Sequence, residues 1–210
     1  YQRAGALLGK KGVPIDAFAN FKPWVFYSQL SMIDYLQMMA LKPPMDKALY
    51  TRSAAAGKTV GGLEKIEEQV AAFECLNEEE TLHMIEATVE GLEKAEQGGP
   101  KPIEAIVEAY LSGDPETMQQ IMSDDSGMGP ELAKKFFQAL LYDRNRTMAG
   151  RILAKLKEEP GKVHFFAIGA GHYPGDEGLV ALIEKGGHTV TRLTAADAGK
   201  VAPQPAGAGQ

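Results

Sequence analysis

One histidine near the end of the chain follows a short apolar run, in a setting where a ligand could reach its ring. Residues 163–168 (VHFFAI) are rich in β-branched and aromatic side chains, which is typical of a buried strand. The small residues Gly169, Ala170 and Gly171 come next, and His172 closes the turn. Imidazole is the commonest protein ligand for zinc and similar ions, and connecting loops often carry functional sites. His172 is therefore a candidate metal ligand, although a histidine in this place could equally hydrogen-bond a loop carbonyl.

Three other polar residues have types and positions that could support chemistry. Glu64 follows a second β-prone segment, residues 58–63 (KTVGGL). It could act as a metal ligand or general base, or it could be a carboxylate favoured by the start of a helix. Arg144 and Asn145 lie inside the long helix expected over residues 130–159. Arg144 could hold a carboxylate or an oxyanion, or form an ordinary salt bridge. Asparagine is a poor helix former, so Asn145 indicates a polar contact.

The elements around these residues predict an α/β fold that is rich in helix. Apolar residues recur at helical spacing over residues 179–183, two glycines end that helix, and residues 188–193 alternate as another strand. Strand, helix and strand within about 30 residues predict a βαβ unit with a right-handed crossover. We therefore expect a small, mainly parallel sheet with residues 169–172 at the carboxyl end of a strand, where open α/β folds bind ligands.

The remaining chain predicts helices, which we expect to form a large helical insertion in the α/β core. The helix expected over residues 24–39 is apolar almost all round and rich in methionine, which suits core packing, a peptide groove or a dimer contact. Asn77 and Glu80 have the spacing of a capping box. We expect residues 1–194 to form one domain and residues 195–210, rich in proline and glycine, to be a disordered tail.

Composition argues against several classes of protein. The formal net charge of −6 argues against nucleic acid or an anionic membrane surface as the main partner. Cys75 is the only cysteine, which excludes an internal disulfide and a multi-cysteine metal site. No apolar run approaches the roughly 20 residues that a membrane span needs, and no signal peptide is recognisable. The chain opens on Tyr1 rather than methionine, so we expect its natural N-terminus to lie upstream.

A series of short motifs occurs in a distinctive order across residues 14–193. The series is Lys22-Pro23-Trp24, Gly62-Leu63-Glu64, Gln69, Gly113-Asp114, Arg144-Asn145, and Gly169-Ala170-Gly171-His172 followed by Gly175. In order and spacing this series resembles the TraB/PrgY/GumN family, which includes the Tiki proteins.

The resemblance implies a metal-dependent, peptidase-like hydrolase with a fold related to that of the Tiki metalloproteases. That family uses two widely spaced Gly-x-x-His motifs together with acidic residues. The second motif corresponds to Gly169, Gly171 and His172, and Gly175 follows it at the family's spacing. The first motif is not found here, so we expect the domain to lack an N-terminal segment that carries half of the site.

The resemblance also implies roles for individual residues and a cellular setting. His172 and Glu64 would bind a divalent metal (manganese, cobalt or zinc), and Glu64, Arg144 and Asn145 would be catalytic. The substrate would be a peptide or protein, and the protein would be bacterial and exported.

Two other functions stay open from the residues alone. The methionine-rich helix over residues 24–39 could make the chain a non-catalytic peptide- or partner-binding module, or a homo-oligomer. The glycine-rich turn at residues 169–171 could present N–H groups to the phosphate of a nucleotide or to another anion, which the net negative charge disfavours.

Overall fold

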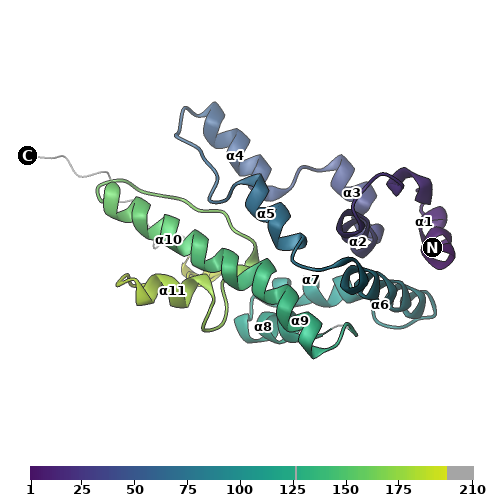
Figure 1. Ribbon diagram of the computed structural model, residues 1–210. Helices are drawn as coiled ribbons and strands as arrows, with labels where there is room; N and C mark the ends of the chain where they lie inside the picture. Colours follow the sequence, from purple (N-terminus) through teal and green to yellow (C-terminus); the bar gives the residue numbers. More distant parts are fainter. Residues whose placement is uncertain (126, 198–210) are drawn as a thin grey trace, which may run out of the picture.

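The computed structural model describes residues 1–125 and 127–197, and the regular structure in those residues is entirely helical (Figure 1). The α-helices are α1 (Gln2–Lys10), α2 (Pro23–Ser31), α3 (Leu36–Leu41), α4 (Met45–Ala55), α5 (Ile66–Phe73), α6 (Glu78–Glu96), α7 (Pro102–Ser112), α8 (Pro115–Ser123), α9 (Pro130–Phe137), α10 (Asp143–Glu158) and α11 (Leu179–Lys185). Short helical turns are η1 (Ile15–Phe18), η2 (Ile33–Tyr35), η3 (Gln138–Tyr142), η4 (Ala170–His172) and η5 (Ala195–Asp197).

The predicted parallel sheet with its βαβ unit is wrong, because no strand occurs in the residues that the structure describes. Residues 58–63, 163–168 and 188–193 are non-helical, but no backbone hydrogen bond joins one of these segments to another. Sheet pairing needs two backbones about 4.8 Å apart. Here Leu63 and Ile168 pack instead against the helical core of α10 and α11. Exposed and half-buried residues alternate along residues 163–168, as they would in a strand. The segment therefore has the burial pattern of a strand, although no strand pairs with it in the part of the chain that the structure describes.

Several predicted helices are confirmed, and one is interrupted. The capping box of α6 is present, with Asn77 Oδ1 accepting from the Glu80 N–H and Glu80 Oε2 accepting from the Asn77 N–H, both at 2.8 Å. The helix expected over residues 24–39 breaks at Met32, which leaves the helical region at φ −105° and ψ 14°. The remainder continues through η2 into α3, which exposes Met38 and Met39.

Two separate apolar clusters hold the helices together. The first joins α1, α2 and α6, and its buried members are Ala4, Leu7, Leu8, Leu30, Ile33 and Val89. The second joins α10 and α11, and its buried members are Met148, Ala149 and Leu179. The second cluster also takes up Leu63 and Ile168, so it fixes the residues that follow each of them, Glu64 and Gly169, beside α10.

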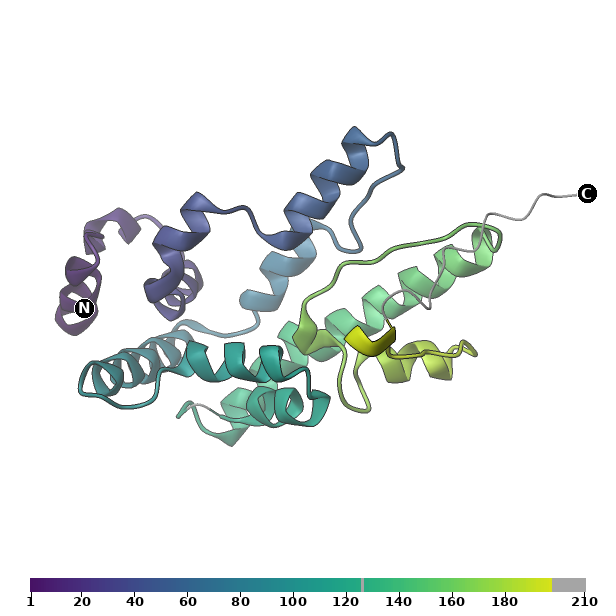
Figure 2. The same cartoon turned by 180° about the vertical axis from the view of Figure 1, so that it is seen from behind.

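The segment after α10 runs back along that helix in both views and delivers η4 near its N-terminal half (Figures 1 and 2). η4 contacts both η3 and α8. Residues 198–210 of the predicted tail lie outside the described residues, so its disorder stays a prediction. Within the described ranges, no helix is both long and apolar enough to cross a membrane.

Candidate functional site

Glu64 and Arg144 form a two-pronged ion pair. Arg144 Nε donates to Glu64 Oε1 and Arg144 Nη2 donates to Glu64 Oε2, each at 2.7 Å. The Glu64 side chain is only 7% exposed, and the Arg144 side chain is 18% exposed. The Arg144 hydrogen bonds hold the pKa of Glu64 below its usual value, against the opposing effect of burial. Glu64 is therefore an anion at neutral pH with both oxygens engaged, and Gln69 Nε2 lies 3.4 Å from Oε2.

A π-helical turn precedes Arg144 and gives its guanidinium a further partner. η3 joins α9 to α10 without a break, so the long helix predicted over residues 130–159 is confirmed with one widened turn. Arg144 Nη1 donates to the carbonyl of Leu140 in this turn at 2.8 Å. Turns of this kind concentrate at functional sites. Adjacent helical residues point about 100° apart, so Arg144 can reach Glu64 while Asn145 faces another segment.

Asn145 fixes the ring of His172. Asn145 Nδ2 donates to the Glu177 carbonyl at 2.8 Å, so the amide oxygen is the atom that faces His172 Nδ1, at 2.6 Å. An amide oxygen can only accept, and Nδ1 must therefore carry the proton. Asn145 is 1% exposed and His172 is 8% exposed. The tautomer that results leaves a lone pair on Nε2 of His172.

The surroundings keep His172 neutral. Burial and the nearby Arg144 charge lower the pKa of His172 from 6.5 to about 4, although Glu64 opposes this shift. Within the described residues Nε2 has no hydrogen-bond partner, and the only buried side-chain nitrogen or oxygen without one there is Trp24 Nε1. Nε2 of His172 must therefore reach solvent. The site combines an accessible, unprotonated imidazole nitrogen with an adjacent Arg–Glu pair.

The structure thus places four predicted site residues together, as two bonded pairs on neighbouring faces of α10. Of the three motif glycines, Gly175 is the one that must be glycine. It has φ +81°, and a Cβ there would lie 3.1 Å from Gln119 Nε2. Added Cβ atoms at Gly169 and Gly171 would make only ordinary contacts. The Gly175 turn holds the loop to α8.

A second clamp near the site follows a pattern that the sequence shows but that our sequence analysis did not use. Arg151 Nη1 donates to the Leu63 carbonyl at 2.6 Å and to Glu68 Oε2 at 2.7 Å, and Nη2 donates to Glu68 Oε1 at 2.6 Å. These bonds lower the pKa of Glu68 to about 2. Arg144 and Arg151 are seven residues apart, which places them on one face of α10. Their partners, Glu64 and Glu68, are four residues apart. These two spacings together are the signal from which the two ion pairs could have been predicted.

The described residues do not by themselves make a metal centre. They contain no cluster of three or more His, Cys, Asp or Glu side chains that could hold an ion. His172 offers one nitrogen, and both oxygens of Glu64 are engaged by Arg144. A catalytic zinc ion typically has three protein ligands. A metal at this site would need further ligands from outside the described residues.

Two N–H groups at the end of the glycine-rich turn are used within the turn itself. The N–H groups of His172 and Tyr173 donate to the carbonyls of Gly169 and Ala170. Anion binding by the N–H groups of residues 169–171 stays a prediction.

The neutral, oriented His172 and the largely buried Glu64–Arg144 pair beside it define the candidate functional site of this helical fold. The chain belongs to the TraB/PrgY/gumN family, whose profile matches residues 1–192. The family resemblance predicted from the sequence is therefore confirmed.

Named relatives in this family are Tiki metalloproteases. The chain is 30% identical over 172 residues to "Metalloprotease TIKI2" of Xenopus tropicalis, an alignment covering 73% of this chain and 32% of that protein. It is 27% identical over 172 residues to "Metalloprotease TIKI1" of Danio rerio, covering 73% and 34%. It is 25% identical to "Metalloprotease TIKI homolog" of Amphimedon queenslandica, covering 72% and 33%. The chain thus spans about a third of the length of these relatives. No solved structure matches it.

Proposed function

We propose that this chain carries part of the active site of a metal-dependent peptide hydrolase. The observation that carries the proposal is the hydrogen bond between His172 Nδ1 and Asn145, two residues that are 27 apart in the sequence. This bond leaves Nε2 of His172 unprotonated and facing solvent. Metal-bound histidines characteristically donate their other ring N–H in this way. The family membership and the names of the relatives support the same reading.

In this proposal His172 is a ligand of a divalent ion whose other ligands lie outside the described residues. Asn145 is a positioning residue that holds the ring in the ligand tautomer. Glu64 positions Arg144, and it could serve as ligand or base only by giving up bonds to Arg144. Arg144 uses three N–H groups in the bonds described above, and the guanidinium has five. The other two are available for a substrate carbonyl or a developing oxyanion.

The test is metal binding by a form of the protein extended at its N-terminus, where the further ligands are expected, and by three single variants of that form. Elemental analysis and titration with manganese, cobalt and zinc should give one bound ion in the wild type and none in His172→Ala. Asn145→Ala should weaken binding by about 10- to 100-fold, the usual effect of losing such a supporting bond. His83→Ala is the control, because His83 is exposed on α6 and should bind no differently. Unchanged metal content in His172→Ala would refute the proposal.

A second candidate, a non-catalytic peptide- or partner-binding module, is supported by one surface. Leu41 and Met45 flank the junction of α3 and α4 and are 84% and 67% exposed. Large exposed apolar side chains of this kind favour contact with another polypeptide. Saturable binding of a peptide without metal and without cleavage would favour this function over hydrolysis.

A further inference from the structure

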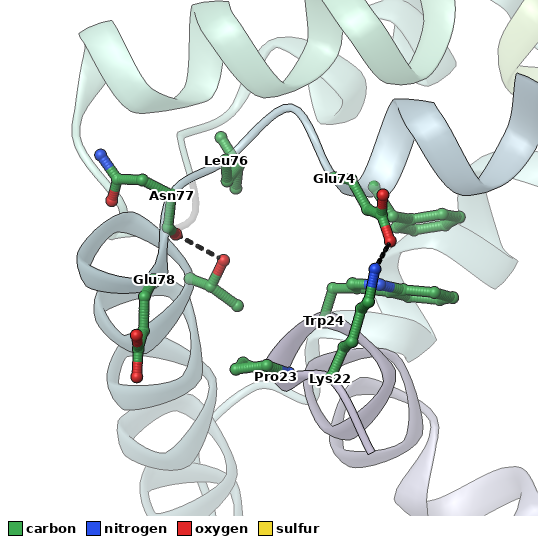
Figure 3. A pocket seen from close by; sticks show the side chains of 9 residues that line it. Lys22, Pro23, Trp24, Glu74, Leu76, Asn77 and Glu78 are labelled. Atoms are coloured by element: carbon green, nitrogen blue, oxygen red, sulfur yellow. Dashed lines mark hydrogen bonds and ion pairs between the residues drawn. The ribbon is translucent and has the colours of Figure 1, made fainter.

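A pocket of about 270 Å³ lies between the N-terminal ends of α2 and α6 and the residues that join α5 to α6 (Figure 3). The motif Lys22-Pro23-Trp24 forms one side of this pocket. The pocket does not include Glu64 or Arg144, and the proposed hydrolysis does not use it. Its size suits a single side chain rather than a large cofactor.

The pocket has an aromatic wall with an unusual polar atom. The rings of Trp24 and Phe73 stack with centroids 5.2 Å apart and planes inclined by 16°. Leu76 and Pro23 add further apolar surface. Trp24 Nε1 is buried and makes no hydrogen bond of normal geometry in the described ranges. Its nearby acceptor is the carboxylate of Glu74, whose pKa is lowered by Lys22 and, more weakly, by the indole N–H. The carbonyl of a bound peptide could give this donor a better-aligned acceptor.

One ion pair borders the pocket. Lys22 Nζ bonds to Glu74 Oε1, and both side chains lie beside Trp24 (Figure 3). The pair is exposed and therefore easily rearranged. A peptide that enters the pocket could take a bond from either partner with its own backbone.

Helix α5 connects this pocket to the candidate active site. Phe73 lines the pocket, and Gln69, four residues earlier, reaches toward Glu64. Residues four apart share one helix face and are about 6 Å apart along the axis. The pocket and the Glu64 carboxylate therefore lie toward opposite ends of one face of α5.

We propose that the Trp24 pocket binds an apolar side chain of a peptide substrate whose backbone runs along α5 toward Glu64. This inference rests on the proposed function, because it assigns a substrate class to that same site. The apolar choice follows from the stacked aromatic wall together with Leu76 and Pro23.

The binding test uses the single tryptophan of the chain. Trp24 is the only tryptophan in the 210 residues, so its fluorescence reports directly on the pocket. The metal-free chain is titrated with N-acetyl-leucinamide, N-acetyl-phenylalaninamide and N-acetylglycinamide. We expect a saturable emission shift with the first two probes and none with the third. No shift with any probe, or an equal shift with the glycine compound, would overturn the proposal.

Two matched variants test whether the apolar probes bind in the Trp24 pocket. Leu76→Phe fills the pocket and should weaken the apolar probes by about tenfold or more. Leu82→Phe makes the same change at an exposed position of α6 and should leave their binding intact. An equal loss in both variants, or no loss in Leu76→Phe, would contradict the assignment of the pocket.

Failure of the fluorescence test and failure of the metal test can be distinguished. A shift in a protein that binds no metal refutes hydrolysis and, with it, the pocket's role as a substrate subsite. Metal binding without a shift refutes the pocket alone. In a hydrolysing protein, Leu76→Phe should raise KM for peptides with an apolar residue in the pocket and leave kcat unchanged, because only substrate binding is lost.

Discussion

The buried, neutral state of His172 makes the stability of the fold depend on pH. The pKa of His172 is lowered from 6.5 to about 4, so the unfolded chain binds a proton on this ring at pH values where the folded chain does not. Stability should therefore be fully present above pH 6.5 and fall as the pH drops toward 4. The loss should be about 2 kcal/mol, less than the full shift implies, because the ring is partly screened by solvent.

Urea unfolding at several pH values measures this effect, and His172→Gln is the informative variant. The variant cannot gain a proton at this position, so its stability should depend less on pH between 6.5 and 4. Parallel pH profiles for the two proteins would show that other groups cause the acid sensitivity.

The Glu64–Arg144 pair should matter more to stability than other Arg–Glu pairs of the chain. Removing one partner of a largely buried pair leaves a charge without its counterion. Arg144→Ala should therefore destabilise the fold by about 1–3 kcal/mol, reduced from the fully buried case by residual solvent access. Arg3→Ala breaks the two-pronged pair with Glu93 at the surface and is the control. Equal unfolding midpoints in denaturant for the two variants would contradict this ranking.

Replacing glycine by alanine should have opposite effects on stability at two positions near the site. Gly175→Ala places a Cβ at φ +81° and 3.1 Å from Gln119 Nε2, so it should destabilise the fold by about 1–2 kcal/mol. Gly150→Ala is in the middle of α10 with open space around the added atom, and should stabilise it by roughly 0.5–1 kcal/mol. Thermal unfolding of the two variants should shift in opposite directions, and a shared direction would be inconsistent with the loop geometry.

At the scale of the element, the π-helical turn sets the rotation of α9 relative to α10. Deleting Ala139 from η3 should convert the turn to ordinary α-helix and rotate α9 by about 100°. Phe136, buried and in edge contact with Tyr27, would then leave its position. We expect retained helix by circular dichroism and a clearly lower unfolding temperature. Ala139→Gly, which keeps the register, should have a much smaller effect.

The local signals for helices are strong enough to be read from the sequence. Asn77 and Glu80 predicted the start of α6, because this signal lies within one turn of the helix it begins. Asp114 caps α8 in the structure by a similarly local contact. The π-helical turn had no such signal. The turn affects the site because the backbone carbonyl of Leu140 accepts a hydrogen bond from Arg144. The pattern of side chains in a sequence does not indicate which backbone carbonyl a side chain will contact.

The sheet could not be predicted correctly because pairing is not a local property. Residues 163–168 have the composition of a strand, yet Ile168 packs on Met148, Ala149 and Leu179 of a helical core. The family resemblance, together with their positions after the two β-prone segments, implied that Glu64 and His172 share one site. The two groups are close enough to affect each other's pKa. Their joint function stays a prediction. Both follow apolar segments that pack on the same core, and that placement holds whether or not the segments pair as strands.

At the scale of the whole molecule, α4 and the end of α3 stand at the edge of the fold in both views (Figures 1 and 2). No residue of α4 is buried, and Met45 and Tyr50 are among its exposed side chains. Methionine and tyrosine are enriched in protein interfaces, and methionine adapts readily to a partner surface. α4 carries Asp46 as well as Lys47 and Arg52, so its charge does not decide which partner binds it. We therefore expect a second copy of the chain to bind this surface.

Sedimentation velocity over a range of protein concentrations tests this association. The wild type should form dimers whose fraction rises with protein concentration, because association removes the exposed Leu41 and Met45 from water. Replacing Leu41 and Met45 by lysine should give a monomer. Leu111→Lys introduces the same charge at another strongly exposed leucine, on α7, and should leave the dimer in place. A wild type that stays monomeric at every concentration, or a control that dissociates equally, would show that this surface does not mediate self-association.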